Sequence, residues 1–213
     1  TRFLPKPGND HSLPSANVLS LVVDAGGSLW VGTDNGLASW GTQGFERISP
    51  TLLSGSIVYS MYSEEDGSLW IGTTQGLDRR FNDGRIERSV WKDVLGPAVV
   101  MSMLRDRQGM RWLMTNKGVL LETKRGLELM KGNTVPGMTL AAQQDDEGGI
   151  WFATLSDGLR RLPPGWRNFS LTQDLGPTRS GQRRLAFASR RRGGFWVGMT
   201  WGGIEYWDAA RGK

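Results

Sequence analysis

The chain has 213 residues, no cysteine and a formal net charge of +5. Its length suits one domain with a sizeable core, and the lack of cysteine excludes disulfides, thiolate catalysis and cysteine metal sites. No segment has the roughly 18 consecutive apolar residues that would span a membrane, and there is neither a signal peptide nor an initiating methionine. We therefore expect the chain to be a piece of a longer protein.

The first residues in chain order, Thr1–Leu4, resemble the outer strand of a repeat unit that has no partner before it. A loop with three prolines leads from there to Asn17. The apolar segment 18–23 is rich in branched residues and short, which predicts a strand. A tight turn follows, and its glycine, Gly27, suits the positive φ that such turns require.

The second strand of the unit is predicted at residues 29–33, with a tryptophan at Trp30. Further glycine-containing turns separate it from strands predicted at 37–40 and 45–48. An acidic residue, Asp24, stands six positions before the tryptophan, where its side chain can bond the backbone of the first turn. The segment therefore predicts four antiparallel strands.

Copies of this unit recur along the whole sequence. Aligned on the tryptophan, they are separated by 39 to 45 residues, and each has a glycine three positions earlier. The tryptophans are Trp30, Trp70, Trp112, Trp151 and Trp196, and the glycines are Gly27, Gly67, Gly109, Gly148 and Gly193. We predict that these ten residues are structural, the tryptophans as core between blades. The period and the four-strand unit predict an all-β fold, a β-propeller of five four-stranded blades.

The five blades are assigned to one propeller domain, residues 1–213. The repeats cover approximately 17–48, 57–90, 99–130, 138–169 and 183–207, with 1–4 as a possible last strand. Two arrangements remain open. Residues 1–4 can close a five-blade ring by an N-terminal strand clasp, or the five blades are part of a larger propeller. Both give the same strand count.

The pattern D-x-x-G-x-L-W-x-G-T-x-x-G-L runs from Asp24 to Leu37 and is nearly repeated from Glu64 to Leu77. It resembles the two-component regulator propeller repeat, and the segment Asp10–Val18 resembles that family's blade linker. The resemblance implies the sensor region of bacterial hybrid histidine kinases or diguanylate cyclases, periplasmic or otherwise extracytoplasmic, in an inner-membrane protein. It also implies rings that usually have seven blades.

Ligands of propellers usually bind at the end where the turns between strands two and three meet the loops between blades. The predicted ligand-contacting residues lie in those loops: His11, Asp34, Asn35, Gln75, Lys117, Asp157 and Trp201. Most polar residues in such turns simply form the turn. Trp201 differs because a tryptophan at a loop tip can stack on a sugar ring or anchor a partner, although packing beside Trp207 fits equally well.

From these observations we expect a non-catalytic domain that binds a small molecule or glycan and needs no cofactor and no metal. The implied partners are adjoining domains of the same receptor, which dimerises at full length, and the membrane is reached only through segments outside this chain. No nucleic-acid partner is expected, because the basic run Arg190–Arg192 lacks a recognised motif.

Two alternatives stay open. One is a lyase resembling the streptogramin lyases, whose chemistry relies on a central histidine with magnesium, whereas His11 in the linker is the one histidine of this sequence. The other is a lectin-like carbohydrate-binding propeller with an equivalent sugar site on every blade. Loop tips that differ from blade to blade favour a single asymmetric site.

Overall fold

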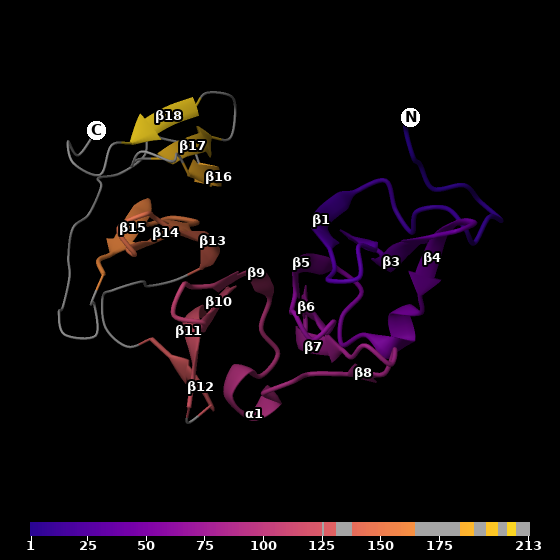
Figure 1. Ribbon diagram of the computed structural model, residues 1–213, viewed down its shortest axis with the longest axis horizontal. Helices are drawn as coiled ribbons and strands as arrows, with labels where there is room; N and C mark the ends of the chain where they lie inside the picture. Colours follow the sequence, from indigo (N-terminus) through magenta and orange to yellow (C-terminus); the bar gives the residue numbers. More distant parts are fainter. Residues whose placement is uncertain (125, 131–137, 165–183, 190–194, 200–203, 208–213) are drawn as a thin grey trace. The chain divides into compact units, whose positions relative to one another are not determined.

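The structure is a computed structural model, and it describes residues 1–124, 126–130, 138–164, 184–189, 195–199 and 204–207. The chain divides into two compact units, Thr1–Met103 and Leu104–Lys213. Strands dominate both units, and in every sheet the hydrogen-bonded neighbours follow one another in chain order (Figure 1). The predicted all-β class is confirmed.

The first unit holds two four-stranded antiparallel sheets, in the orders β1-β2-β3-β4 and β5-β6-β7-β8. The strands of the first are β1 (Val18–Val23), β2 (Leu29–Thr33), β3 (Gly36–Gly41) and β4 (Gly44–Ile48). Those of the second are β5 (Val58–Ser63), β6 (Leu69–Thr73), β7 (Gly76–Arg80) and β8 (Ile86–Glu87). Two short helical segments lie in the connections that follow these sheets, the 3-10 turn η1 (Pro50–Leu52) and the helix α1 (Lys92–Leu95).

The strand β9 (Val100–Arg105) spans the boundary between the units and belongs to the sheet β12-β11-β10-β9. Its partners are β10 (Arg111–Thr115), β11 (Gly118–Thr123) and β12 (Gly126–Leu129). Two sheets of three described strands follow. They consist of β13 (Thr139–Gln144), β14 (Ile150–Thr154) and β15 (Leu159–Leu162), and of β16 (Arg184–Ser189), β17 (Phe195–Met199) and β18 (Ile204–Trp207). The outer strand predicted near 166–169 lies outside the described residues.

Neither η1 nor α1 has the length and hydropathy of a membrane-crossing helix, and no other helix occurs in the described part of the chain. The predicted strand limits agree with the observed ones to within a residue or two in the first blade. Residues 1–4 are not part of a strand. The N-terminal clasp and the larger propeller both stay predictions. Phe3 makes edge-on contacts with Trp40 and Phe45, at ring-centroid distances of 5.0 and 5.6 Å, because this aromatic cluster offers an apolar surface.

A carboxylate closes the first hairpin of a blade and holds its tryptophan. In the first blade, Asp24 Oδ1 accepts hydrogen bonds from the backbone N–H groups of Gly26 and Ser28, both at 2.9 Å. Its Oδ2 accepts the indole N–H of Trp30 at 2.7 Å. The turn glycine Gly27 has φ 85°, a conformation that costs a residue with a side chain free energy. One carboxylate thus fixes both the turn and a core side chain.

The same arrangement recurs in the third and fourth blades. Asp106 accepts the indole N–H of Trp112 at 2.8 Å, and Asp145 accepts that of Trp151 at 2.8 Å. Asp106 also accepts the backbone N–H groups of Gln108 and Met110, and Asp145 accepts that of Gly149. A buried indole N–H without a hydrogen-bond partner would destabilise the fold. The spacing of six residues between the aspartate and the tryptophan places the carboxylate where it can accept this N–H.

A second repeated contact packs one blade against the next in the first unit. A one-residue bulge in β1 brings Ser20 opposite Gly32, and the Ser20 hydroxyl donates to the carbonyl of Val58 in the next blade. Ser60 donates in the same way to the carbonyl of Val100 at 3.1 Å. Both valines are fully buried.

Glycine is required opposite these serines. A Cβ atom at Gly72 would lie 2.8 Å from the carbonyl oxygen of Val100 and 3.0 Å from its Cγ1. The apolar cluster beside this contact contains side chains from both of the first two blades: Trp30, Leu37, Leu53, Val58, Leu69 and Ile71. In the second unit, Trp112 and Phe152 lie in a comparable cluster, with ring centroids 5.8 Å apart.

Replacing Asp24 by asparagine should remove charge-assisted hydrogen bonds and lower the free energy of unfolding at pH 7 by about 1–3 kcal/mol. Burial alone would raise the pKa of Asp24, but the hydrogen bonds from Trp30, Ser28 and Gly26 lower it below its ordinary value of 3.8. The stabilisation is therefore present above that value and is lost as the pH falls through the lower folded-state pKa.

Urea unfolding of the wild type and of Asp24→Asn, from pH 7 down to about pH 3, checks this expectation. The difference between the two proteins should shrink at the acidic end. The exposed Asp10 gives a control, since Asp10→Asn should change stability by less than about 0.5 kcal/mol. A difference that stays constant with pH would contradict the role of the Asp24 carboxylate.

Gly72→Ala should lower the free energy of unfolding by about 1–3 kcal/mol, because the added methyl group meets the backbone of Val100. The matched control is Gly41→Ala, because the three atoms nearest to its added methyl group belong to the side chain of the exposed Glu46, which can move aside. Thermal unfolding of both variants provides the measurement. Equal effects at the two positions would show that the close approach at Gly72 does not matter.

Candidate functional site

The turns at the predicted ligand-binding end share one hydrogen-bond pattern. In each, a buried threonine hydroxyl donates to the carbonyl of the glycine at or just before the start of the next strand and accepts the backbone N–H of the loop-tip residue. The threonines are Thr33, Thr73, Thr115 and Thr154, and the tip residues are Asn35, Gln75, Lys117 and Asp157. These four tip residues are thus structurally equivalent.

Two predicted residues of the first blade are engaged by the N-terminal loop. Asp34 Oδ2 accepts the side-chain amide of Asn17 at 2.6 Å, and Asn35 donates to the carbonyl of Pro14 at 3.4 Å. Hydrogen bonds from the side chains of Ser15 and Asn17 lower the pKa of Asp34. These residues are occupied in fastening the loop to the blade.

His11 also has a structural contact. Its carbonyl oxygen accepts the backbone N–H of Phe45 at 3.1 Å, and its own N–H donates to Asn9. In the second unit, Lys117 is exposed and Asp157 forms an ion pair with Arg160 at 2.9 Å. Trp201 lies outside the described residues.

Among the predicted residues, Gln75 lines a cavity in the first unit at this end of the blades. The cavity has a volume of about 620 Å³. Its lining residues are Ser54, Gln75, Arg88, Ser89 and Lys92, and we refer to it as the Gln75 cleft. Ser54 belongs to the connection between the first and second blades, and the last three belong to the connection between the second and third. Two connections and one turn thus form a single polar site.

A fully buried carboxylate fixes both walls of the Gln75 cleft. Asp78 Oδ2 accepts the backbone N–H of Ser54 at 2.7 Å, and its Oδ1 accepts that of Ser89 at 2.8 Å. Burying a charge costs free energy, and hydrogen bonds to the charged group offset that cost. Ser89 has φ 52°, which is uncommon for a residue other than glycine. The cleft is therefore preorganised.

Asp78 has no counterpart in the first, third and fourth blades. The residue two positions after the turn glycine is Ala38 in the first blade, Leu120 in the third and Arg160 in the fourth, whereas the fifth copy of the sequence has Glu205. Among the first four blades, only the second has a carboxylate there that can tie its two inter-blade connections together. Sequence reasoning missed Asp78, although an acidic residue at a position that is apolar in two other repeats was a signal.

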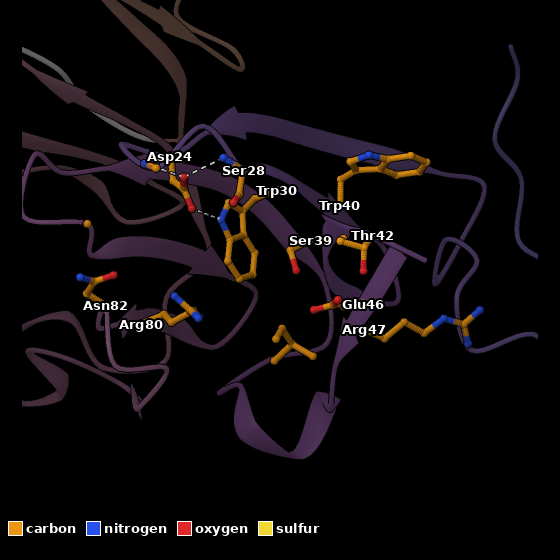
Figure 2. A pocket seen from close by; sticks show the side chains of 14 residues that line it. Asp24, Ser28, Trp30, Ser39, Trp40, Thr42, Glu46, Arg47, Arg80 and Asn82 are labelled. Carbon is orange, nitrogen blue, oxygen red and sulfur yellow. Dashed lines mark hydrogen bonds between the residues drawn. The ribbon is translucent and has the colours of Figure 1, made fainter. Parts of the chain in front are cut away.

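A second cavity of about 570 Å³ lies at the other end of the strands, between the hairpin turns of the first two blades. Figure 2 shows Ser39, Glu46 and Arg80 directed toward the space beside Trp30, whereas Arg47 points away from it. Arg47 is held by the N-terminal loop, where it donates to the carbonyl of Ser12 at 2.8 Å.

Several groups in this second cavity already have partners within the protein. Asp24 holds its turn and Trp30, as Figure 2 shows by dashed lines. The guanidinium of Arg80 lies over the Trp30 ring, 4.8 Å from its centroid. Because these contacts maintain the blade, we assign this cavity a structural role and take the Gln75 cleft as the candidate site.

Groups of three or more acidic or histidine side chains placed to hold a metal ion do not occur in the described ranges. The Gln75 cleft offers cations, hydroxyls and an amide, which suit the recognition of a polar ligand.

Comparison of the sequence with known families gives one match. Residues 12–35 and 52–75 match the family model described as two component regulator propeller. These segments contain the first two copies of the repeat. No curated protein sequence matches the chain.

Solved structures resemble the chain at low sequence identity. The extracellular domain described as that of hybrid two component system BT3049 from B. thetaiotaomicron matches all of this chain and 36% of its own, with 20% identity and a TM-score of 0.65. The corresponding domain of BT4673 from the same organism matches 99% of this chain and 31% of its own, with 17% identity and a TM-score of 0.77. The chain therefore spans about a third of those domains.

Virginiamycin B lyase from Staphylococcus aureus also shares the fold, with 16% identity, a TM-score of 0.64 and coverage of 96% of this chain and 72% of its own. Identities this low establish the fold and not the activity. The successive antiparallel sheets and these likenesses define a β-propeller protein. Within that class, residues 12–35 and 52–75 match the two-component regulator propeller repeat, which the sequence resembled.

Asp78→Asn should destabilise the first unit by about 1–3 kcal/mol, because the asparagine NH₂ group would face a backbone N–H donor and one bond to Ser54 or Ser89 would be lost. Amide hydrogen exchange at Ser54 and Ser89 should accelerate. The control is Asp83→Asn, since Asp83 is exposed and accepts one bond from the backbone of Arg85. Unchanged protection of both amides would refute the proposed anchoring by Asp78.

Proposed function

We propose that this chain is a ligand-sensing domain of a bacterial transmembrane signal-transduction receptor, of the two-component or diguanylate cyclase type. It binds its ligand without chemical turnover, and any kinase or cyclase activity lies in other domains. The observation that carries this proposal is the Gln75 cleft, a single preorganised polar site in a chain with regulator propeller repeats.

The position of the cleft suits signalling. Its walls come from the two connections that flank the second blade, and Asp78 couples them through Ser54 and Ser89. A ligand that contacts both connections changes the relative free energies of the arrangements that the two connections can adopt. Binding can then alter packing against adjoining domains and bias the geometry of a receptor dimer.

The extracytoplasmic location is part of the same proposal. It is supported by the likeness to extracellular domains of hybrid two component systems, of which this chain matches about a third. The receptor's membrane-spanning segments and output domain are assigned to sequence beyond these residues. The ligand is a small molecule or a glycan.

The asymmetry of the site distinguishes this function from the alternatives. A lectin-like propeller would present equivalent sites, whereas the residue at the Asp78 position differs between blades. A streptogramin-type lyase would use a histidine at its centre, whereas His11 lies in the N-terminal loop and bonds Phe45 through its backbone.

A binding screen tests the proposal. The 213-residue chain is examined by thermal shift and calorimetry against amino acids, organic acids and a glycan array. We expect one class of compound to bind at one site per chain, and Gln75→Ala to weaken that binding by about tenfold or more, because a hydrogen bond in the cleft is lost. Lys117→Ala, at the equivalent tip of the third blade, serves as the control and should bind normally.

Three outcomes would contradict the proposal. They are the absence of any ligand, several equivalent glycan sites per chain, and turnover of a cyclic depsipeptide in the presence of magnesium. The second outcome would establish the lectin alternative, and the third would establish the lyase.

A further inference from the structure

We propose that the Gln75 cleft recognises an oxyanion group, a carboxylate, sulfate or phosphate, carried by a larger polar ligand. This inference rests on the proposed function and specifies the chemistry of its ligand. Both charged residues that line the cleft, Arg88 and Lys92, are cationic, and the other three carry hydroxyl or amide groups. This composition matches the hydrogen-bond needs of an oxyanion.

Arg88 is partly positioned by the protein and partly available. Its Nη1 donates to the carbonyl of Thr51 at 3.1 Å, and the guanidinium has five N–H donors in all. Its side chain is exposed at the cleft, as is that of Lys92. Within the described part of the chain, neither cation forms an ion pair with a carboxylate. Arg88 can therefore present a planar, two-point donor to an oxyanion.

The nearby carboxylates do not cancel this charge. Glu87 and Asp93 are exposed neighbours in the sequence, but neither lines the cleft. Asp78 lies beneath the walls with both oxygens bonded to backbone N–H groups. The two cations, Arg88 and Lys92, and the single carboxylate of Asp78 together leave one positive charge in excess. This excess favours the binding of an anion.

The two serines offer different groups on the opposite walls. Because the Thr73 hydroxyl donates to the carbonyl of Gly76, the Ser54 hydroxyl donates to Thr73 at 3.0 Å and offers a ligand only its lone pairs. The Ser89 hydroxyl has no protein partner among the described residues and supplies a neutral donor. Since Asp78 holds both serines by their backbones, their side chains are placed before a ligand arrives.

The size of the cleft sets the kind of ligand. About 620 Å³ greatly exceeds the space that one inorganic anion fills. A ligand of this size can place its anionic group on Arg88 and Lys92 and an uncharged polar part on Gln75. Organic acids and acidic sugars both fit this description.

Amide and arginine side-chain NMR of the labelled 213-residue chain tests the inference. Sodium phosphate, sodium sulfate and sodium acetate are titrated separately at constant ionic strength kept with sodium chloride. We expect saturable shifts at Ser54, Gln75, Ser89 and the Arg88 side chain, and the three anions distinguish which oxyanion is preferred.

The double variant Arg88→Gln with Lys92→Gln keeps side chains of polar character and removes both charges. It should weaken anion binding by about tenfold or more, since charge-assisted hydrogen bonds are lost. Lys124→Gln, which removes an exposed cation from the turn between β11 and β12, should leave the binding unchanged. An equal loss in Lys124→Gln would show a general charge effect and overturn the site.

Shifts that never saturate, that chloride reproduces, or that occur away from the cleft would also overturn the inference. The two proposals can fail separately. If an uncharged compound from the binding screen occupies the cleft while all three anions fail, the sensor function stands and the oxyanion inference is wrong. If no compound of any kind binds, both are wrong.

Discussion

The structure depends on a hydrogen bond between a turn carboxylate and the tryptophan six residues later. In Asp24 and its equivalents, one oxygen closes the hairpin and the other accepts the indole N–H. The bond lets the first, third and fourth blades bury the ring of their tryptophan with its N–H satisfied. Trp30 and Trp112 are accordingly 4% and 0% exposed, and the cores form around such rings.

The second blade departs from this pattern, and it is also the blade that carries the cleft. Here Glu64 stands at the carboxylate position, and Asp66 holds the turn through the backbone of Ser68. The Trp70 ring stacks on Trp91 with centroids 5.2 Å apart, and Arg79 lies over its ring at 5.0 Å. Trp91 belongs to the same inter-blade connection as Arg88 and Ser89, so the altered tryptophan site helps to anchor one wall of the cleft.

Much of the fold could be predicted because the repeat encodes it several times. The strands around Trp30 follow from alternating apolar residues and turn glycines, and each copy supports the others. The N-terminal residues could not be assigned in this way, because the aromatic contact of Phe3 with Trp40 joins segments far apart in the sequence and occurs once. The role of Asp78 is similarly a contact between distant backbone groups, at Ser54 and Ser89.

The candidate site was only partly predictable for a related reason. The repeated threonines, such as Thr73, bind the backbone of the turn and leave the side chain at its tip, Gln75, outside the hydrogen bonds that define the fold. Tip side chains can therefore diverge without loss of stability, and their identity in the sequence does not show which of them meets a cavity. That is decided by the connections between blades, whose course depends on a single buried carboxylate. A propeller of this kind keeps its fold in the positions that repeat and gains a specific site where one blade breaks the repeat.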